Sequence, residues 1–205
     1  MADMDGDVAV ALPESAKPAI PELDRTASRL TALVRRIGRV ECALVARIAA
    51  PARAGALRHC AIYLNKLGNG WLYALMTLLV LGSGNSRRWY VVLSAVLAAG
   101  CAHAVYRLLK RRVRRPRPFD ADDSLTSLAP PLDEYSFPSG HCMTFAAVLV
   151  PVSLAFPSMF APLVGTWLLI AWARLASAHH YPSDVLAGTA LGVVAAWPIS
   201  VLMLN

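Results

Sequence analysis

The chain has 205 residues and a formal net charge of +7, and 57% of its residues are hydrophobic whereas only 16% are charged. Because soluble globular domains carry about 25% charged residues, this composition indicates a membrane protein. A soluble protein with buried apolar helices fits poorly, since a chain of this length cannot cover several such helices with polar surface.

The first 66 residues are far more polar than the rest. Residues 1–24 contain six acidic residues and three prolines, which is typical of a disordered acidic tail, and they lack the basic start and apolar core of a signal peptide. Residues 25–66 are rich in arginine and contain apolar residues at spacings of three and four: Leu30, Leu33, Val34, Ile37, Val40, Leu44 and Ile48. We expect an amphipathic helix lying on anionic membrane lipids, with a partner-binding helix as the alternative.

From residue 67 onward, uncharged runs predict membrane-spanning helices. The runs 67–86, 89–106 and 185–205 each have close to the ~20 residues that cross a hydrocarbon core of ~30 Å. The run 142–173 is too long for one crossing, and Pro157 near its middle predicts two helices joined by a tight turn. The predicted fold class is all-α: an integral membrane helical bundle of about five transmembrane helices plus an N-terminal amphipathic interfacial helix. The predicted spans are 68–84, 89–109, 140–156, 159–178 and 184–204.

Because each crossing changes sides, four polar helix ends are predicted to meet at one membrane face. They carry the sequences KRRVRRPRP, PSGH, ARLASAHH and PSDV. Every Lys and Arg except Arg87 and Arg88 falls on this side, so the positive-inside rule places the polar face in the cytoplasm of a multi-pass cell or inner membrane protein. Four arginines are expected to be interfacial anchors: Arg111, Arg112, Arg114 and Arg115.

The polar face has the donors of an anion site. Ser139 is expected to be the N-cap of a helix that begins at Gly140, whose first turn has unpaired backbone N–H groups. Lys110, Arg117 and Arg174 converge from other helix ends, and so many donors suit an anion with several oxygens, such as phosphate.

Two histidines indicate chemistry in addition to binding. Asp184 lies four residues after His180 and can hold one imidazole nitrogen, leaving the other free to attack phosphorus. His141 comes from another helix end and can protonate the leaving oxygen. A metal site at His179, His180 and Asp184 is a weaker alternative, because adjacent side chains point apart and nearby arginines repel a cation. The four cysteines have no CxxC spacing, and we expect no disulfide or metal role for them.

Three motifs resemble those of the type 2 phosphatidic acid phosphatase superfamily of lipid phosphatases. KxxxxxxRP matches residues 110–118, PSGH matches residues 138–141 and RxxxxxHxxxD matches residues 174–184. This resemblance covers residues 67–205 and implies that His180 is a nucleophile that forms a phosphohistidine, that Asp184 orients it, and that His141 is the general acid and later the base for water. It also implies that no metal or other cofactor is needed. The phosphate oxygens would be held by Lys110, Arg117, Ser139, Gly140 and Arg174.

The chain departs from this family at two points. Ala173 stands where the family usually has serine, and the basic amphipathic segment stands near the place of the first transmembrane helix of six-span relatives. We therefore expect an acidic tail (1–24), a basic interfacial segment (25–66) and a catalytic transmembrane domain (67–205).

The expected activity is hydrolysis of a phosphatidate-type lipid or an isoprenoid diphosphate. The expected partners are this phosphorylated lipid and anionic membrane lipids at the N-terminal helix, and we expect no nucleic acid. The main alternative is a non-catalytic membrane protein that binds lipid phosphates, followed by a metal-dependent membrane hydrolase and a haloperoxidase. The two histidines with Asp184 favour the phosphatase, because binding alone needs no nucleophile.

Overall fold

The computed structural model describes residues 21–204, so the predicted acidic tail lies outside the described residues except for its last four. The described residues divide into two units after Gly38, and this boundary falls within helix α1 (Pro21–Ala49). The helical bundle and the candidate site both belong to the second unit.

All regular elements within residues 21–204 are helices, which confirms that the fold is all-α, as predicted. The elements after α1 are η1 (Ala50–Arg53), α2 (Gly55–Leu67), α3 (Trp71–Gly82), α4 (Arg88–Val113), α5 (Pro118–Ala121), α6 (Gly140–Ala155), η2 (Pro157–Met159), α7 (Phe160–Ala176) and α8 (Pro182–Leu204). The five predicted spans overlap α3, α4, α6, α7 and α8, although α3 begins at Trp71 instead of residue 68 and α4 ends at Val113 instead of residue 109. As predicted, the long apolar run is broken at Pro157, where η2 separates α6 from α7.

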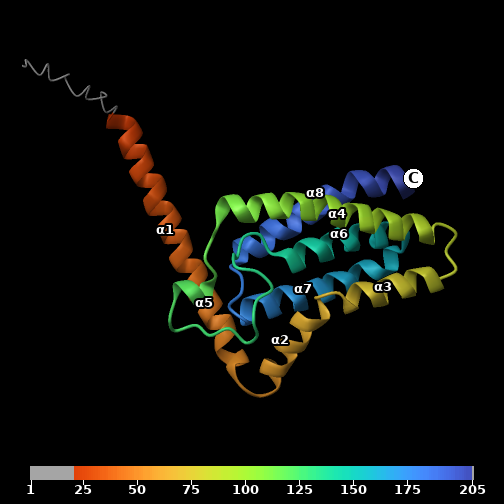
Figure 1. Cartoon of the computed structure of the whole chain (residues 1–205), viewed down its shortest axis with the longest axis horizontal. Coiled ribbons are helices and arrows are strands. Elements are labelled where there is room, and N and C mark those ends of the chain that lie inside the picture. The colour runs from red at the N-terminus through yellow and green to blue at the C-terminus, as the bar shows by residue number, and fades with distance from the viewer. Residues whose placement is uncertain (1–20, 205) are drawn as a thin grey trace, which may run out of the picture. The chain divides into compact units, whose positions relative to one another are not determined.

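Helix α6 is the central helix of the bundle (Figure 1). Helices α4 and α8 pack against it and against each other, and α7 also packs against it. Because α6 has neighbours on several sides, consecutive residues such as Phe145, Ala146 and Ala147 are all buried. A helix with apolar residues on all its sides, as this one has after its first turn, is typical of such a buried position.

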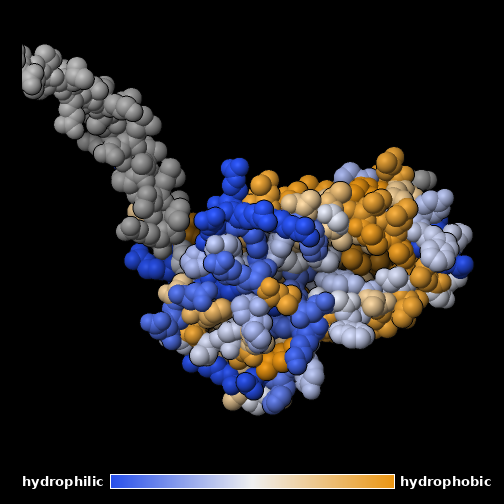
Figure 2. All heavy atoms as spheres, viewed as in Figure 1, coloured by the Kyte–Doolittle hydropathy of each residue, from blue (hydrophilic) through white to orange (hydrophobic). Residues whose placement is uncertain are grey.

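The outer surface of the bundle is apolar, and Figure 2 shows hydrophobic residues gathered over its outer helices. Exposed large side chains include Leu75, Leu78, Leu79, Val96, Leu97, Leu108, Leu168, Leu169, Leu186, Val194 and Leu202. Small residues such as Ala98, Ala147 and Ala196 fill the contacts between α4, α6 and α8 instead. Small residues inside and large apolar residues outside are the pattern of helices that pack within lipid.

Three helical segments are long and apolar enough to cross a membrane, namely Arg88–Ala121, Pro157–Ala176 and Pro182–Leu204. Helices α3 and α6 are apolar but shorter, and at 1.5 Å per residue the 16 residues of α6 reach about 24 Å. The count of five spans therefore stays a prediction for α3 and α6.

The last part of α1 packs against the bundle through one face. Glu41, Val45 and Ala49 recur every four residues and are buried, whereas Val40 is 63% exposed and Leu44 is 43% exposed. One helical face is thus occupied by the bundle, while two apolar side chains next to it remain on the surface.

Candidate active site

The polar helix ends meet at one end of the bundle. The backbone N–H of Ser139, just before α6, donates to the carbonyl of Asp184 in α8 at 3.0 Å. Arg117, in the linker after α4, donates to the carbonyl of His179 in the loop between α7 and α8 at 2.7 Å. These contacts join four segments that are far apart in sequence.

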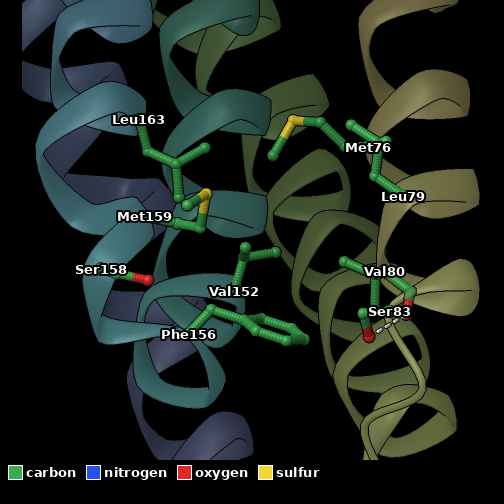
Figure 3. Close-up of a pocket in the computed structure, with 9 residues that line it drawn as sticks. All are labelled: Met76, Leu79, Val80, Ser83, Val152, Phe156, Ser158, Met159 and Leu163. Atoms are coloured by element: carbon green, nitrogen blue, oxygen red, sulfur yellow. Dashed lines mark hydrogen bonds between the residues drawn. The ribbon is translucent and has the colours of Figure 1, made fainter.

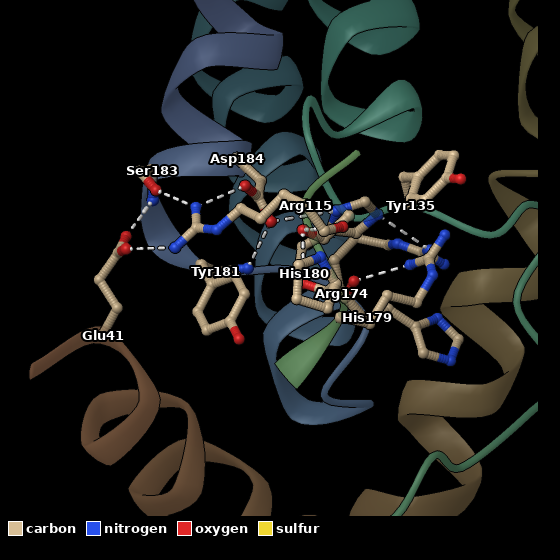
Figure 4. Close-up of polar contacts among 12 residues, drawn as sticks. Glu41, Arg115, Tyr135, Arg174, His179, His180, Tyr181, Ser183 and Asp184 are labelled. Carbon is tan, nitrogen blue, oxygen red and sulfur yellow. Dashed lines mark hydrogen bonds and ion pairs between the residues drawn. The ribbon is translucent and has the colours of Figure 1, made fainter. Parts of the chain in front are cut away.

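His180 and Asp184 face each other in a fully enclosed position (Figure 4). His180 is 2% exposed and Asp184 is 0% exposed. The imidazole Nδ1 lies 3.6 Å from Asp184 Oδ2, which is slightly beyond hydrogen-bond distance. Asp184 lies in the first turn of α8, and its Oδ2 also accepts from the backbone N–H of Tyr181 at 2.8 Å. This bond fixes the carboxylate oxygen that faces the imidazole.

Arg174 determines the tautomer of His180. One of its Nη atoms lies 3.2 Å from His180 Nε2. Because a guanidinium can only donate, Nε2 must be the acceptor, and the proton of the neutral ring lies on Nδ1, toward Asp184. Burial and the charge of Arg174 hold the pKa of His180 well below its usual 6.5. His180 is therefore a neutral imidazole at pH 7, with a lone pair on the nitrogen opposite the carboxylate.

His141 lies in the first turn of α6, and its ring meets the turn between α2 and α3. Its Nε2 is 2.8 Å from Asn69 Oδ1 and 3.3 Å from the carbonyl oxygen of Asn65. Since a carbonyl can only accept, this nitrogen carries the proton. A side chain at Gly68 would place its Cβ 2.6 Å from the His141 ring, so any larger residue there would displace the ring.

Asn65 connects the two catalytic candidates. Its Oδ1 accepts from Arg174, the residue that contacts His180, and its Nδ2 donates to Ser177 Oγ at 2.8 Å. Its backbone carbonyl faces His141. Asn65 and Asn69 were not predicted from sequence; the available signal was two asparagines four residues apart immediately before an apolar run.

Lys110 and Arg117, two predicted phosphate ligands, are buried and share one carboxylate. Asp133 accepts from the Lys110 ammonium, and its Oδ1 is 2.5 Å from a guanidinium nitrogen of Arg117. The hydroxyl of Tyr106 donates to the other oxygen of Asp133. Burial favours the neutral acid, but the hydrogen bonds from Lys110 and Tyr106 and the adjacent cations outweigh it, so the pKa of Asp133 lies below its usual range.

The other predicted phosphate ligands include buried donors with no partner among the described residues. Ser139 occupies the N-cap position of α6, as predicted, but its side chain makes no capping bond, and its Oγ is buried without a partner. The Nε of Arg174 is also buried and has no hydrogen-bond partner among the described residues. Gly140 is the first residue of α6. A buried unpaired donor costs about 1–3 kcal/mol, so these atoms are suited to receive the oxygens of an anion.

Arg115 is not an interfacial anchor, and that prediction was wrong. Its guanidinium bonds Asp184 Oδ1 at 2.8 Å and Glu41 Oε2 at 2.6 Å (Figure 4). Arg114, just before it, has left-handed backbone angles (φ 49°, ψ 38°) at the end of α4. The chain therefore leaves the helix direction at Arg114, and Arg115 reaches the start of α8. Pro116 was the signal, because the residue before a proline avoids helical conformation.

His179 points away from the carboxylate that its neighbour faces. Its Nε2 is 2.7 Å from Ser127 Oγ and 2.9 Å from the carbonyl of Ala129. Burial and the charge of Arg174 lower its pKa to about 3. Among the described residues, no three His, Cys, Asp or Glu side chains are arranged to hold a metal ion.

Two cavities differ in their chemistry. The first, of about 290 Å³, adjoins the candidate site and is lined by Gly68, Asn69, Gly70, Tyr73, His103, Leu132, Gly140, His141 and Thr144. The second, of about 240 Å³, lies toward the far ends of α3 and α6 and is almost entirely apolar (Figure 3). Its hydroxyl groups are those of Ser83, which bonds the carbonyl of Val80, and Ser158. Only the first cavity therefore offers acid–base chemistry.

A family model described as the PAP2 superfamily matches residues 88–205. The chain is 35% identical over 106 residues to a lipid A 1-phosphatase from Rhizobium etli, which covers 50% of this chain and 42% of the relative. It is 35% identical over 127 residues to a decaprenylphosphoryl-5-phosphoribose phosphatase from Mycobacterium tuberculosis, with 60% of this chain and 66% of the relative covered. The matches thus span from less than half to about two thirds of these relatives.

The fold is also similar to that of a solved structure. The crystal structure of LpxE from Aquifex aeolicus superimposes with a TM-score of 0.64 at 25% sequence identity. The match covers 78% of this chain and 93% of that one. Membrane helices and this similarity together indicate an integral membrane protein.

Proposed function

The chain belongs to the PAP2 superfamily, and from this premise we propose that it is a membrane phosphatase that hydrolyses a lipid phosphate monoester or diphosphate without a metal, through a phosphohistidine at His180. The observation that supports this most is the orientation of the His180 ring. Its Nε2 lone pair faces Arg174, and its Nδ1–H faces Asp184. A nucleophilic imidazole with an orienting carboxylate on its far side is an arrangement that supports covalent catalysis.

In the first step, Nε2 of His180 attacks the terminal phosphorus, and the bond from this phosphorus to the leaving oxygen breaks. The leaving oxygen is the lipid oxygen of a monoester or the bridging oxygen of a diphosphate. The ring becomes positively charged, and Asp184 stabilises this charge through Nδ1–H. Arg174, Lys110 and Arg117 stabilise the negative charge on the phosphoryl oxygens, together with Ser139 and the N-terminus of α6. Lys110 and Arg117 already donate to Asp133. For them to bind the phosphate, its oxygens must replace the Asp133 carboxylate at some of these N–H groups.

His141 supplies the proton that the leaving lipid oxygen needs. It lines the cavity beside the site, where the departing group would lie. In the second step, a water molecule replaces this group and His141 takes a proton from the water. The oxygen of the water attacks phosphorus, and the bond from phosphorus to Nε2 of His180 breaks. The products are the lipid alcohol, or lipid monophosphate from a diphosphate, and inorganic phosphate, and the two histidines return to their starting states.

The site supplies from side chains the positive charge that a metal supplies in other phosphatases. Lys110, Arg117 and Arg174 are each less than 9% exposed. Such buried cations stabilise a phosphoryl group strongly and would oppose the binding of a divalent cation nearby. This supports a metal-independent reaction.

The substrate we propose is a phosphorylated lipid whose headgroup enters the polar end while its tail stays among the outer apolar side chains. The relatives are named as phosphatases of lipid A and of a decaprenyl phosphoribose, both of them phosphorylated lipids. Phosphatidate-type lipids and isoprenoid diphosphates have the same division between a charged head and an apolar tail.

The direct test is phosphate release by the purified protein in detergent, with excess EDTA, from phosphatidic acid, phosphatidylglycerol phosphate, lipid A, farnesyl diphosphate and undecaprenyl diphosphate. We expect turnover of at least one of them and no loss on addition of EDTA, because protein cations do the work of a metal. Activity that disappears with EDTA and returns with added Zn²⁺ or Mg²⁺ would indicate a metal-dependent hydrolase. Lipid binding without turnover would favour the non-catalytic alternative.

We also propose that the site faces the cytoplasm and that α1 lies on anionic lipid. Exposed Val40 and Leu44 beside exposed Arg36, Arg39 and Arg47 support the second point. With five spans, the two termini lie on opposite sides. We expect alkaline phosphatase fused after residue 205 to be active outside the cytoplasm and a fluorescent protein fused at the N-terminus to fluoresce inside it. The reverse pattern would place the site on the outer face.

A further inference from the structure

The second half of α1 contacts the loop that carries His180. Val45 and Ala49 form a buried cluster with Ala178 and Tyr181, the residues on either side of the His179–His180 pair, and with Leu125. This part of α1 precedes residue 88, where the match to the family model begins. A segment outside the recognised domain is therefore packed directly against the candidate nucleophile loop.

Glu41 is the polar member of the buried face of α1, and it binds the start of α8. Its Oε1 accepts from the backbone N–H of Ser183 at 2.8 Å, and its Oε2 accepts from Arg115 at 2.6 Å. Burial alone would raise the pKa of Glu41, but the hydrogen bonds from Ser183 and Arg115 outweigh it and lower the pKa. Glu41 is therefore a carboxylate at pH 7, in the position where a helix N-terminus stabilises negative charge.

Arg115 bridges Glu41 and the candidate catalytic carboxylate. One terminal nitrogen bonds Asp184 Oδ1 at 2.8 Å and Ser183 Oγ at 2.7 Å, while the other bonds Glu41. The guanidinium also lies over the ring of Tyr181, 3.8 Å from its centroid. A planar guanidinium can hold two carboxylates in fixed relative positions, which a lysine ammonium cannot do in the same way.

This bridge determines which oxygen of Asp184 is available to His180. Arg115 occupies Oδ1, and the backbone of Tyr181 holds Oδ2 at 2.8 Å, on the side where Nδ1 of His180 lies. We propose that Glu41 and Arg115 are positioning residues for Asp184, and that α1 is thereby part of the catalytic centre; this inference rests on the proposed phosphohistidine mechanism. Glu41 acts through Arg115, and Arg115 acts through Asp184.

The test compares Arg115→Gln, Arg115→Lys, Glu41→Gln and the double variant Glu41→Gln/Arg115→Gln in the phosphate-release assay. We expect Arg115→Gln to lower kcat by about 10- to 100-fold, a typical loss for a residue that orients a reactive group, with little change in KM. Arg115→Lys should recover part of the loss because it keeps the charge. Glu41→Gln should cost less, and the double variant should be no slower than Arg115→Gln, since both residues act through one carboxylate.

Two substitutions serve as matched controls. Arg112 and Glu134 are exposed, and the described residues make no hydrogen bond or ion pair with their side chains. Arg112→Gln and Glu134→Gln should keep the wild-type kcat. Melting temperature and gel-filtration profile are measured for every variant, so that a folding defect is separated from a lost orientation.

The outcomes separate this inference from the proposed function. If wild-type protein is active, His180→Ala is not, and folded Arg115→Gln keeps the wild-type kcat, the positioning role is refuted while the phosphatase stands. If Arg115→Gln does not fold, the Arg115→Lys and Glu41→Gln variants provide the test. A wild-type kcat in both of them refutes the positioning role. Independent losses that multiply in the double variant also refute it.

If wild-type protein releases no phosphate from any lipid, the proposed function fails, and binding of orthovanadate becomes the readout. Orthovanadate resembles the transition state of phosphoryl transfer and should raise the melting temperature of a protein that binds it. Arg115→Gln must then reduce this rise relative to Arg112→Gln. An equal rise in both variants refutes the positioning role.

Discussion

Replacing His180 by alanine is expected to reduce phosphate release by a factor on the order of 10⁴ or more, as happens when the nucleophile of a catalytic unit is removed. The imidazole carries the only lone pair that both faces Arg174 and is backed by a carboxylate within the described residues. Initial rates on the best substrate of the panel measure the effect.

His179→Ala is the matched control for this experiment. His179 adjoins His180 in the sequence and is equally buried, but its ring bonds Ser127 and Ala129. We expect His179→Ala to slow the reaction far less than His180→Ala, because it disturbs only the contacts of the loop and removes no reacting atom. A folded His180→Ala protein with activity close to that of His179→Ala would contradict the phosphohistidine mechanism.

Replacing Gly192 by alanine is expected to destabilise the bundle strongly. The new Cβ would overlap the carbonyl oxygen of Met143 and lie 2.9 Å from the Cβ of Ala146 and 3.0 Å from the backbone nitrogen of Ala147. These atoms belong to the backbone and first side-chain carbon of α6 and cannot rotate away, so α6 and α8 must separate. Overpacking of this kind costs about 1–3 kcal/mol or more, which corresponds to a fall in melting temperature of roughly 2–12 °C.

Thermal unfolding in detergent measures this effect, and Gly165→Ala in α7 is its control. A Cβ at Gly165 would meet no atom within 4 Å, so the substitution should be neutral or stabilising because alanine favours helix. Equal melting temperatures for Gly192→Ala and Gly165→Ala would show that α6 and α8 are not packed as tightly as the structure has them.

Gly188→Ala should lower the rate of phosphate release in addition to the melting temperature, because its Cβ would overlap the backbone of Ser139.

The helices could be predicted from the sequence because their ends are marked by local chemistry. Pro157 divides the long apolar run, and the start of α6 at Gly140 follows Ser139 in the N-cap position. The predicted bounds of α6 and α7, the two halves of this run, therefore lie within two residues of the observed bounds. The start of α3 was less accurate, at residue 68 instead of Trp71, because Gly68 to Gly70 form an uncharged turn that hydrophobicity alone does not separate from the helix.

Contacts between distant segments could not be predicted in the same way. Arg115 was grouped with its arginine neighbours because its partner Glu41 lies 74 residues away, and only the folded chain places them together. The same holds for Asp133, whose contacts with Lys110 and Arg117 could not be read from the sequence. Charge type alone does not show which of several nearby arginines turns inward, since this depends on the backbone angles at Arg114.

Asp133 gives the proposed phosphate site a counter-ion of its own. The buried cations Lys110, Arg117 and Arg174 would repel one another. Without a counter-ion they would bind chloride or another lipid headgroup in place of the substrate. A carboxylate shared by Lys110 and Arg117 neutralises part of that charge within the chain, on a loop residue whose side chain is still 34% exposed. Under the proposed function, substrate binding is an exchange of one anion for another. The affinity for phosphate would then reflect the difference between two anions, and the product would be released more readily than from a cluster of cations without a carboxylate.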